Sequence, residues 1–279
     1  MRASIRAAPW AFPSCPLARR SRSTPLSPFA RLDSCLSPAP DAARVAFLRA
    51  QPFAHRGLHG KGLVENSLAA FDAAIAAGYG MECDVRASQD GVAFVFHDAD
   101  LDRLTAEKGK LADRSASLLD AVILSGAREP LPRLDALLHR IDGRAPLLIE
   151  VKAPTRNVIR ICRATRRALE GYRGPVAIMS FNPLVASWFR REAPHIVRGL
   201  VVTEEGKQGY RGRIARTLAL WKAKPDFLAY DVRDLPSRFP ARARQRGLPV
   251  LTWTVRNAAA EQVAFAHADE SIFEIPGDG

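Results

Sequence analysis

Short apolar runs alternate with longer segments of helical periodicity from about residue 44 to the C-terminus. Such runs predict buried strands, and the Ala-, Leu- and Arg-rich segments between them predict helices. We expect strands at Pro52–Arg56, Gly80–Arg86, Val92–His97, Pro146–Lys152, Pro175–Phe181, Val197–Val202, Phe227–Val232 and Val250–Val255. We expect helices at Asp41–Ala50, Ser67–Ala77, Leu134–Arg140, Asn157–Glu170, Pro183–Glu192, Tyr210–Ala223, Pro236–Arg246 and Asn257–Ala266.

Eight strands that alternate with helices predict a (β/α)₈ barrel, the TIM-barrel class. A doubly wound open sheet is the alternative, but no G-x-G-x-x-G or P-loop sequence follows any strand. One connection departs from the alternation, because Gln89-Asp90-Gly91 is a hairpin signal. A hairpin there would fold Val92–His97 back beside Gly80–Arg86, with Glu82 opposite His97 to within two residues; a tight parallel crossover is the other possibility.

The N-terminal segment has a different composition from the rest of the chain. Residues 1–50 hold eight arginines, two aspartates, seven prolines and no lysine. Prolines at this spacing prevent a long helix, and the low hydrophobicity prevents a core. We therefore expect residues 1–43 to be a disordered Pro- and Arg-rich extension and residues 44–279 to be one TIM-barrel domain. A targeting signal and a start site placed too early are the other interpretations.

Composition excludes several broad classes. The chain has 279 residues, of which 47% are hydrophobic and 25% charged, and this balance excludes fibrous and fully disordered proteins. No stretch approaches the roughly 18 uninterrupted apolar residues of a membrane-spanning helix. Half of the net charge of +12 lies in residues 1–50, so the total charge is a weak indication of nucleic-acid binding. The four cysteines form no C-x-x-C pair, which favours a reducing, cytoplasmic location.

Ionisable residues gather at the ends of the first four expected strands, where barrel enzymes carry their chemistry. Three carboxylates there suit a hard divalent cation such as Mg²⁺ or Ca²⁺, and zinc is disfavoured because the group lacks cysteine and an H-x-H pattern. Arg and Lys suit phosphate oxygens, and two histidines can serve as general acid and general base. The group consists of His55, Arg56, Glu82, Asp84, His97, Glu150 and Lys152.

Several motifs together resemble the glycerophosphodiester phosphodiesterase family over roughly residues 50–275. They are His55-Arg56-Gly57, Glu65-Asn66-Ser67, Glu82-Cys83-Asp84-Val85, Gln89-Asp90-Gly91, His97-Asp98, Leu101-Asp102-Arg103, Ile149-Glu150-Val151-Lys152, Ser180-Phe181-Asn182 and Trp253-Thr254-Val255-Arg256-Asn257. The resemblance implies a TIM barrel of the phospholipase-C-like phosphodiesterase type. It also implies metal-dependent hydrolysis of glycerophosphodiesters to glycerol 3-phosphate and an alcohol, in glycerophospholipid breakdown.

The resemblance further implies a role for each matching residue. His55 and His97 correspond to the acid/base pair, and Arg56 and Lys152 to phosphate-binding residues. Glu82, Asp84 and Glu150 correspond to ligands of a divalent metal, Mg²⁺ or Ca²⁺. In the family mechanism the glycerol 2-hydroxyl attacks phosphorus, and water then opens the cyclic phosphate. Which histidine acts first as the base stays open.

Other residues carry weaker expectations. Phe181 and Trp253 could form an apolar wall for the substrate or belong to the core, and Glu65 could reach the site or order the His55–Arg56 loop. We expect Asn66 to cap a helix, Asp98 to orient its neighbours, Cys83 to face the core and His59 to be a solvated loop residue. Asp231 could face the site. The family's Thr-Asp-x-Pro ending is replaced by Phe273-Glu274-Ile275-Pro276, which puts that wall in doubt.

Three functional hypotheses follow. The first is a metal-dependent glycerophosphodiesterase that acts on a small-molecule substrate and does not bind nucleic acid. The second is a related lysophospholipase D, which requires an apolar groove at the barrel mouth; the sequence shows no clear membrane-insertion helix. The third is a non-catalytic phospholipid- or nucleic-acid-binding protein that uses the basic surface. It is disfavoured because every expected acid, base and ligand position is filled, and the basic helices lack interleaved aromatic residues.

Overall fold

The computed structural model describes residues 39–60, 62–206 and 209–275. Its strands are β1 (Phe53–Ala54), β2 (Gly80–Ala87), β3 (Ala93–Val95), β4 (Leu147–Val151), β5 (Val176–Ser180), β6 (Val197–Val202), β7 (Phe227–Asp231), β8 (Val250–Val255) and β9 (Glu270–Phe273). Its longer helices are α3 (Leu68–Ala76), α5 (Leu134–Ile141), α6 (Ile159–Ala168), α7 (Pro183–Glu192), α8 (Gly209–Ala223), α9 (Arg238–Gln245) and α10 (Ala258–His267). Short elements are α2 (Ala42–Val45), α4 (Ala116–Leu119) and the 3₁₀ turns η1 (Ala46–Arg49), η2 (Leu111–Asp113) and η3 (Val232–Asp234).

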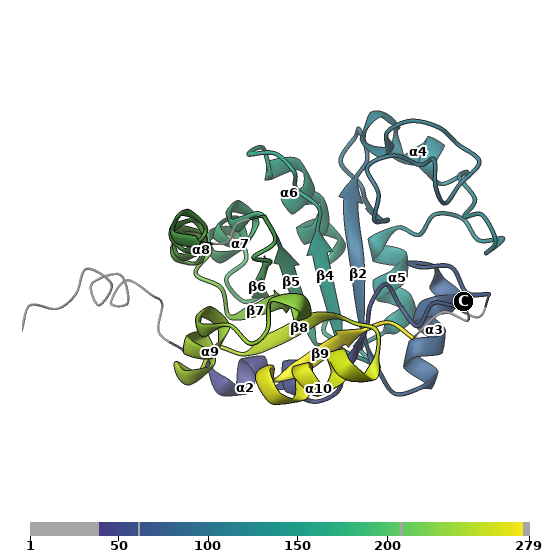
Figure 1. The fold of residues 1–279 in the computed structure, drawn as a ribbon. Coiled ribbons are helices and arrows are strands. Elements are labelled where there is room, and N and C mark those ends of the chain that lie inside the picture. The colour runs from purple at the N-terminus through teal and green to yellow at the C-terminus, as the bar shows by residue number, and fades with distance from the viewer. Residues whose placement is uncertain (1–38, 61, 207–208, 276–279) are drawn as a thin grey trace, which may run out of the picture. The chain divides into compact units, whose positions relative to one another are not determined.

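Eight parallel strands close into the predicted barrel (Figure 1). The strands follow the order β1, β2, β4, β5, β6, β7, β8 and β9, and β9 pairs with β1 to complete the ring. Helices lie between successive strands, as the alternation of apolar runs predicts. The carboxyl ends of all eight strands therefore meet at one rim, where a TIM barrel carries its site.

The third expected strand is not a barrel strand. Residues 93–95 form β3, which runs antiparallel to β2 and pairs Val85 with Val95. The hairpin interpretation of Gln89-Asp90-Gly91 is thus confirmed. The expected set of eight barrel strands, however, wrongly included Val92–His97. The eighth barrel strand is β9, a short segment of mixed polarity that the apolar pattern does not reveal. The β2–β3 register places His97 opposite Cys83, one residue from the expected pairing with Glu82.

The barrel interior is filled by alternate residues of the strands. Their side chains form one apolar cluster, which includes Phe53, Phe227 and Leu251 together with Val45 and Leu48 from α2 and η1. Phe227 fits because its neighbour is Gly199, where an added Cβ would lie 2.3 Å from the ring. The helix predicted at Asp41–Ala50 is therefore part of the barrel domain, with Asp41 accepting a hydrogen bond as its N-cap.

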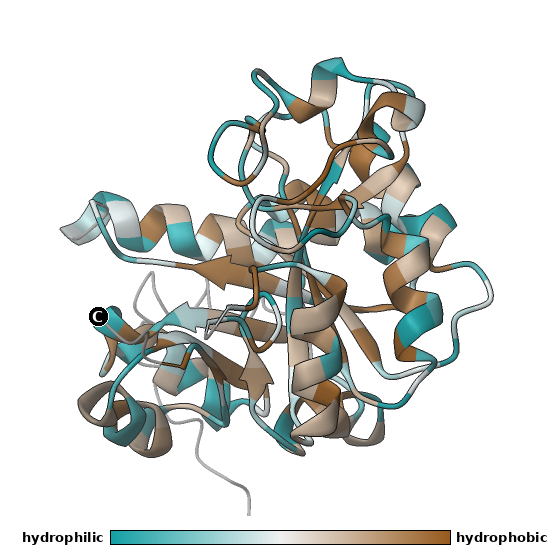
Figure 2. Cartoon of the chain, turned by 90° about the vertical axis from the view of Figure 1, so that its right-hand side faces the viewer, coloured by the Kyte–Doolittle hydropathy of each residue, from teal (hydrophilic) through white to brown (hydrophobic). Residues whose placement is uncertain are grey.

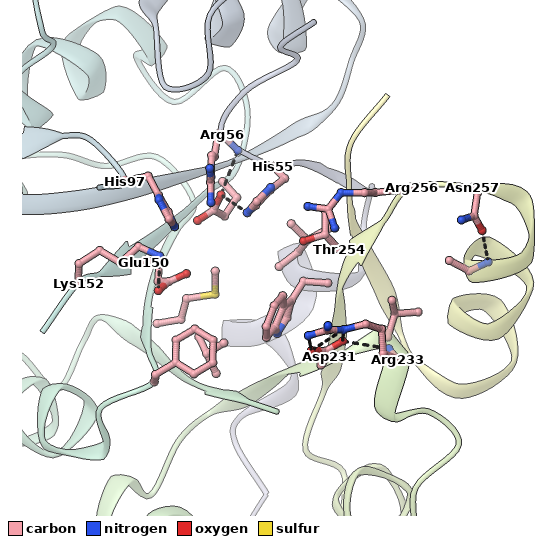
Figure 3. A pocket seen from close by; sticks show the side chains of 18 residues that line it. His55, Arg56, His97, Glu150, Lys152, Asp231, Arg233, Thr254, Arg256 and Asn257 are labelled. Carbon is pink, nitrogen blue, oxygen red and sulfur yellow. Dashed lines mark hydrogen bonds and ion pairs between the residues drawn. The ribbon is translucent and has the colours of Figure 1, made fainter. Parts of the chain in front are cut away.

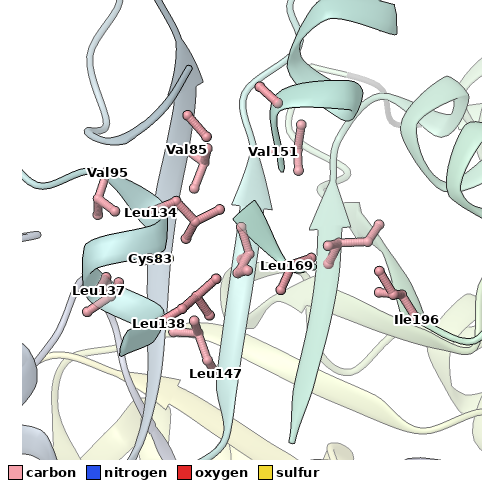
Figure 4. Close-up of a cluster of buried hydrophobic side chains, with 14 of the residues drawn as sticks. Cys83, Val85, Val95, Leu134, Leu137, Leu138, Leu147, Val151, Leu169 and Ile196 are labelled. Carbon is pink, nitrogen blue, oxygen red and sulfur yellow. The ribbon is translucent and has the colours of Figure 1, made fainter. Parts of the chain in front are cut away.

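A second and larger cluster lies between the sheet and the helices α3, α5, α6 and α7 (Figure 4). Cys83 points into this cluster, as predicted, because it alternates with Glu82 and Asp84 along β2. Residues between β3 and α5 form a separate apolar cluster around Phe96, Leu101 and Leu119, near α4. The larger cluster packs against β2 and β4, the strands that carry the three carboxylates.

The N-terminal extension expected at residues 1–43 lies largely outside the described residues. Its last residues do fold, because Asp41 caps α2, which begins at Ala42. Arg44, the first residue of the expected domain, pairs with Asp226 at 3.2 Å. In the part of the chain that the structure describes, no helix is both long enough and apolar enough to cross a membrane.

Candidate active site

The seven ionisable residues expected from the sequence come together at the carboxyl rim of the barrel. Figure 3 labels five of them, His55, Arg56, His97, Glu150 and Lys152. Six of them line a pocket of about 540 Å³, and Asp84 lies just beneath it, in contact with Arg56 and Lys152. Glu82 and Asp84 are fully buried, and Glu150 is 7% exposed. A cluster of buried charges at the mouth of a barrel is expensive to maintain, which indicates a functional site.

A tight turn positions His55 and Arg56 after β1. Arg56 and Gly57 both have positive φ, and a Cβ at Gly57 would lie 2.9 Å from the backbone of Ala70 in α3. Only glycine fits this close approach without displacing the helix. The turn directs the Arg56 backbone N–H toward Glu82, to which it donates a hydrogen bond of 3.0 Å.

The carboxylates of Glu82, Asp84 and Glu150 have ligand oxygens that lie within 4.8 Å of one another. They come from neighbouring positions of β2 and β4, since Asp84 pairs directly with Glu150 in the sheet. Glu82 Oε1 is buried without a hydrogen-bond partner, and the set contains only hard oxygen donors. Both features fit a divalent cation of the Mg²⁺ or Ca²⁺ type, which would satisfy the orphaned oxygen.

Burial and mutual repulsion act strongly on these carboxylates. Burial, together with the charge of Asp84, raises the pKa of Glu82 to about 8. Burial also raises the pKa of Glu150. Asp84 behaves oppositely: although burial opposes its ionisation, Lys152 and Arg56 hold its pKa below the ordinary value. The site therefore carries one firmly ionised carboxylate and two whose ionisation a bound cation would favour.

Two cations flank the carboxylates. Lys152 Nζ lies 2.8 Å from Asp84 and 2.7 Å from Glu150, and Arg56 Nε lies 3.1 Å from Asp84. These carboxylates raise the pKa of both cations against the effect of burial. An anion bound beside the cluster therefore meets two permanent positive charges.

Each histidine is held by a carboxylate at Nδ1. His55 Nδ1 lies 2.5 Å from Glu274, and His97 Nδ1 lies 2.7 Å from Asp98. This contact leaves the Nε2 atom of each ring for proton exchange in the pocket. Burial lowers the pKa of His97, whereas the carboxylates of Glu82 and Glu274 outweigh burial and raise the pKa of His55. The expectation that Asp98 orients its neighbours is confirmed.

Glu274 is the principal site residue that the sequence did not reveal. It follows β9, and Arg256 holds it through contacts of 2.5 Å and 3.1 Å. The departure from the Thr-Asp-x-Pro pattern thus leaves a carboxylate against His55. The missed signal was a charged residue directly after a strand that the apolar pattern did not identify. His59 Nε2 is buried and lies 3.9 Å from the same carboxylate, although the His59 side chain as a whole is 23% exposed. The predicted solvated loop histidine is therefore only partly solvated.

Arg103 connects Glu65, which contacts Arg56, with Asp98, which contacts His97. It contacts Glu65 through two nitrogens and Asp98 through Nε. Glu65 in turn accepts a hydrogen bond of 2.9 Å from Arg56. Of the two expectations for Glu65, the structure favours ordering of the Arg56 loop.

Asn66 does not cap the following helix; Ser67 does. Asn66 is 1% exposed and donates from Nδ2 to Asp84 at 3.0 Å. Its positive φ turns its side chain away from the N-cap position that the sequence predicted.

The opposite wall of the pocket is largely apolar. Phe181 and Trp253 meet edge to face with centroids 5.5 Å apart, beside Met179 and Val201. Asp231 lines the same wall, as expected, but Arg233 neutralises it through contacts of 2.7 Å and 3.0 Å. This wall therefore exposes aromatic rings to the pocket, together with an Asp231–Arg233 ion pair whose charges offset each other.

Fold and site together define a TIM-barrel phosphodiesterase with an acidic cluster that could hold a divalent cation. Residues 55–270 match the model of the glycerophosphoryl diester phosphodiesterase family. The chain belongs to this family and is a phosphoric diester hydrolase. The family resemblance in the sequence is therefore confirmed.

Similarity to individual proteins agrees with this assignment. The chain is 32% identical over 224 residues to a Mycobacterium tuberculosis protein named probable glycerophosphodiester phosphodiesterase 2, covering 72% of this chain and 78% of the relative. A phosphodiesterase from Oleispira antarctica, solved with the product sn-glycerol-3-phosphate, superposes with a TM-score of 0.69 at 22% identity, covering 81% of this chain and 93% of that chain. A glycerophosphodiester phosphodiesterase from Parabacteroides distasonis gives 0.67 at 22% identity, covering 81% and 93%. The two structures support the fold.

Proposed function

We propose that this protein hydrolyses glycerophosphodiesters to glycerol 3-phosphate and an alcohol in a reaction that depends on a divalent metal, during glycerophospholipid breakdown. The observation that carries the proposal is the convergence of three buried carboxylates, two cations and two carboxylate-held histidines on one pocket. Each group meets one requirement of phosphodiester cleavage, and the groups come from the ends of β1, β2 and β4 and from the segment after β3.

Glu82, Asp84 and Glu150 are the residues that would hold the metal. When bound, a divalent cation offsets charge on the non-bridging phosphate oxygens and makes the nucleophile more acidic. Arg56 and Lys152 lie on the same side of the pocket and bind the remaining phosphate charge. Because both cations already contact the carboxylates, the phosphate meets preorganised positive charge.

His55 and His97 exchange protons through Nε2. One accepts the proton of the attacking glycerol 2-hydroxyl while the other donates a proton to the leaving alcohol oxygen, and a cyclic phosphate forms. In the second step the two rings exchange roles, and water opens the cyclic phosphate to glycerol 3-phosphate. Glu274 and Asp98 keep each ring oriented through Nδ1.

A substrate panel with metal add-back tests the proposal. Purified full-length protein is freed of metal with EDTA and assayed for glycerol 3-phosphate with glycerophosphocholine, glycerophosphoethanolamine and glycerophosphoglycerol. We expect release after addition of Mg²⁺ or Ca²⁺ and none before it. Absence of release with every substrate and either metal would contradict the proposal.

Lysophospholipase D activity is the second candidate, favoured by the apolar wall of Met179, Phe181, Val201 and Trp253. Lysophosphatidylcholine in the same panel distinguishes the two. Release of choline from this lipid, at a kcat/KM equal to or above that for glycerophosphocholine, would favour the second candidate.

A further inference from the structure

Helix α8 carries an apolar ridge on its outer face. Four large apolar side chains are exposed at positions i, i+4, i+8 and i+11: Tyr210 at 64%, Ile214 at 37%, Leu218 at 53% and Trp221 at 51%. At 100° per residue they fall within an arc of about 80° and extend over about 16 Å. We name these four residues the α8 ridge.

The opposite face of α8 already contacts the barrel, so the ridge is not needed for packing. Gly212, Arg216, Leu220 and Ala223 are the buried residues of the helix. Arg216 pairs with Glu204 at 2.9 Å and lies over the ring of Phe239. The helix therefore packs on the barrel through one face and directs a second, apolar face outward. In Figure 1 it lies at the periphery of the barrel, next to α7.

Helix α8 also carries exposed basic side chains. Residues 209–223 contain no acidic residue, and Arg211, Arg213 and Lys222 are exposed, whereas Arg216 is buried against Glu204. The neighbouring helices α7 and α9 add Arg190, Arg191, Arg238, Arg242 and Arg244, against the single acid Glu192. Figure 2 shows hydrophobic and hydrophilic residues alternating along the helices of the barrel wall. Exposed apolar side chains with basic neighbours suit a partner that has an apolar interior and an anionic surface.

We infer that the α8 ridge docks this protein onto an anionic lipid bilayer. A bilayer provides both complements, because acyl chains accept Ile214 and Leu218 while anionic headgroups attract the flanking cations. Tyr210 and Trp221 stand at the two ends of the ridge, and rings of this kind favour the level of the headgroups. The helix would lie in the plane of the interface and would not span it. The inference does not depend on the chemistry of the pocket.

Charge disfavours the other occupants. A second copy would bring two surfaces of the same positive sign together, because Arg211 and Lys222 flank the ridge on each copy. Residues 1–38 carry six arginines and one acid, so this segment has the same sign as the helices around the ridge. A nucleic acid would match the charge and leave Ile214 and Leu218 against polar backbone.

Docking also places the substrate entrance near the lipid. Helix α8 begins seven residues after β6 ends, at the rim where Val201 lines the pocket. Tyr210 is thus at the end of the helix nearest to the barrel mouth. An enzyme that consumes fragments of phospholipids gains from this position, because the reaction that supplies its substrate, deacylation of a phospholipid, takes place at the bilayer.

Vesicle co-sedimentation of the full-length protein tests the inference. The probes are vesicles of phosphatidylcholine alone and of phosphatidylcholine with about one third phosphatidylglycerol. We expect binding to the anionic vesicles, weak binding to the neutral ones, and a loss of binding at high salt. The double variant Leu218→Asp/Trp221→Asp should lower the partition coefficient at least tenfold, roughly the effect of removing two buried apolar groups. Phe265→Asp is the matched control, because this side chain is 92% exposed on α10.

Circular dichroism and the rate with a soluble glycerophosphodiester verify that each variant is folded. Absence of binding to anionic vesicles, or an equal loss in Phe265→Asp, would overturn the inference. Two further results would also overturn it: a dimer in light scattering that Leu218→Asp dissociates, or binding that deletion of residues 1–40 abolishes and the double variant leaves intact. Quenching of Trp221 by brominated lipid, measured as the difference from Trp221→Phe, should accompany binding.

Discussion

The two walls of the pocket are built from different parts of the barrel and differ in charge. The wall formed by β1, β2, β4 and the segment after β3 carries His55, Arg56, His97, Lys152 and the three carboxylates. The wall formed by β5 to β8 carries Phe181, Trp253 and the closed Asp231–Arg233 pair. In the first wall each ionisable group is perturbed by its neighbours; in the second the charges cancel. From this difference we propose that the first wall cleaves the phosphodiester bond and that the second selects the alcohol.

The largest expected effect comes from removing a histidine of the charged wall. His55→Ala and His97→Ala should each lower kcat by about 10²- to 10⁴-fold, because the proton transfers lose their donor or acceptor. Stopped or coupled assays of glycerol 3-phosphate release measure the loss. His139→Ala, on the exposed face of α5, is the matched control and should keep full activity. A nearly normal kcat in either site variant would remove that ring from the mechanism.

Metal affinity should depend on pH through the carboxylate cluster. The pKa of Glu82 lies at about 8 without metal, so this carboxyl holds a proton at neutral pH that a cation must displace. Affinity should therefore weaken as the pH falls below 8, and binding should release protons. Calorimetry in two buffers with different ionisation enthalpies measures the released protons, and Glu82→Gln should reduce both the release and the affinity. Proton-neutral binding at pH 7 would contradict the cluster as the metal site.

The support of His55 by Glu274 predicts a smaller loss. Glu274→Gln should lower kcat by roughly tenfold to a hundredfold, the range found for groups that orient a ligand or base. Since Glu274 raises the pKa of His55, the variant should also move the corresponding limb of the pH–rate profile to lower pH. Glu274→Asp should recover part of the rate, and Glu261→Gln on α10 is the control. An unchanged pH profile would reduce Glu274 to a structural role.

The aromatic wall should affect selectivity more than rate. Phe181→Ala should raise KM by several-fold with little change in kcat, because its contact is made with the substrate in ground and transition states alike. The ratio of kcat/KM values across the substrate panel should change in this variant and not in Phe265→Ala. A fall in kcat equal to that of the histidine variants would contradict the proposed division of roles between the two walls.

Deletion of residues 1–40 should have the smallest effect. We propose that the catalytic domain begins near residue 44, and this deletion retains Asp41, the N-cap of α2, and Arg44, which pairs with Asp226. The truncated protein should keep its kcat/KM and its thermal unfolding temperature. A large drop in either quantity would mean that the extension belongs to the folded enzyme.

Strands with a strong apolar pattern were predicted from the sequence, and strands with a weak one were missed. Strands such as β4 and β6 are mostly apolar and buried on both faces, and both were located within a residue or two. By contrast, β9 contains Glu270 and Ser271 and is only partly buried, so no run identified it. The β2–β3 hairpin was recognised from its turn, because Asp-Gly at a tight connection acts through local backbone geometry.

The site followed the same division. Residues inside motifs, such as His55 and Glu150, were identifiable because their spacing places them at strand ends. The contacts of Glu274 with His55 and of Arg103 with Glu65 join residues that lie far apart in the sequence. Asn66 was assigned to a cap because an Asn before a helix satisfies that local role, whereas its positive φ directs the amide to Asp84 instead.

The sequence by itself determined the barrel class, the ionisable residues at the strand ends and the chemistry that they suit. These properties are local, since they depend on periodicity, turn residues and the types of side chain at each position. Only the tertiary structure decided which strand closes the barrel, which carboxylate holds His55 and which face of α8 is left outward. Those outcomes depend on contacts between distant segments. The sequence pattern of an apolar helix face is the same whether the fold covers that face or leaves it exposed.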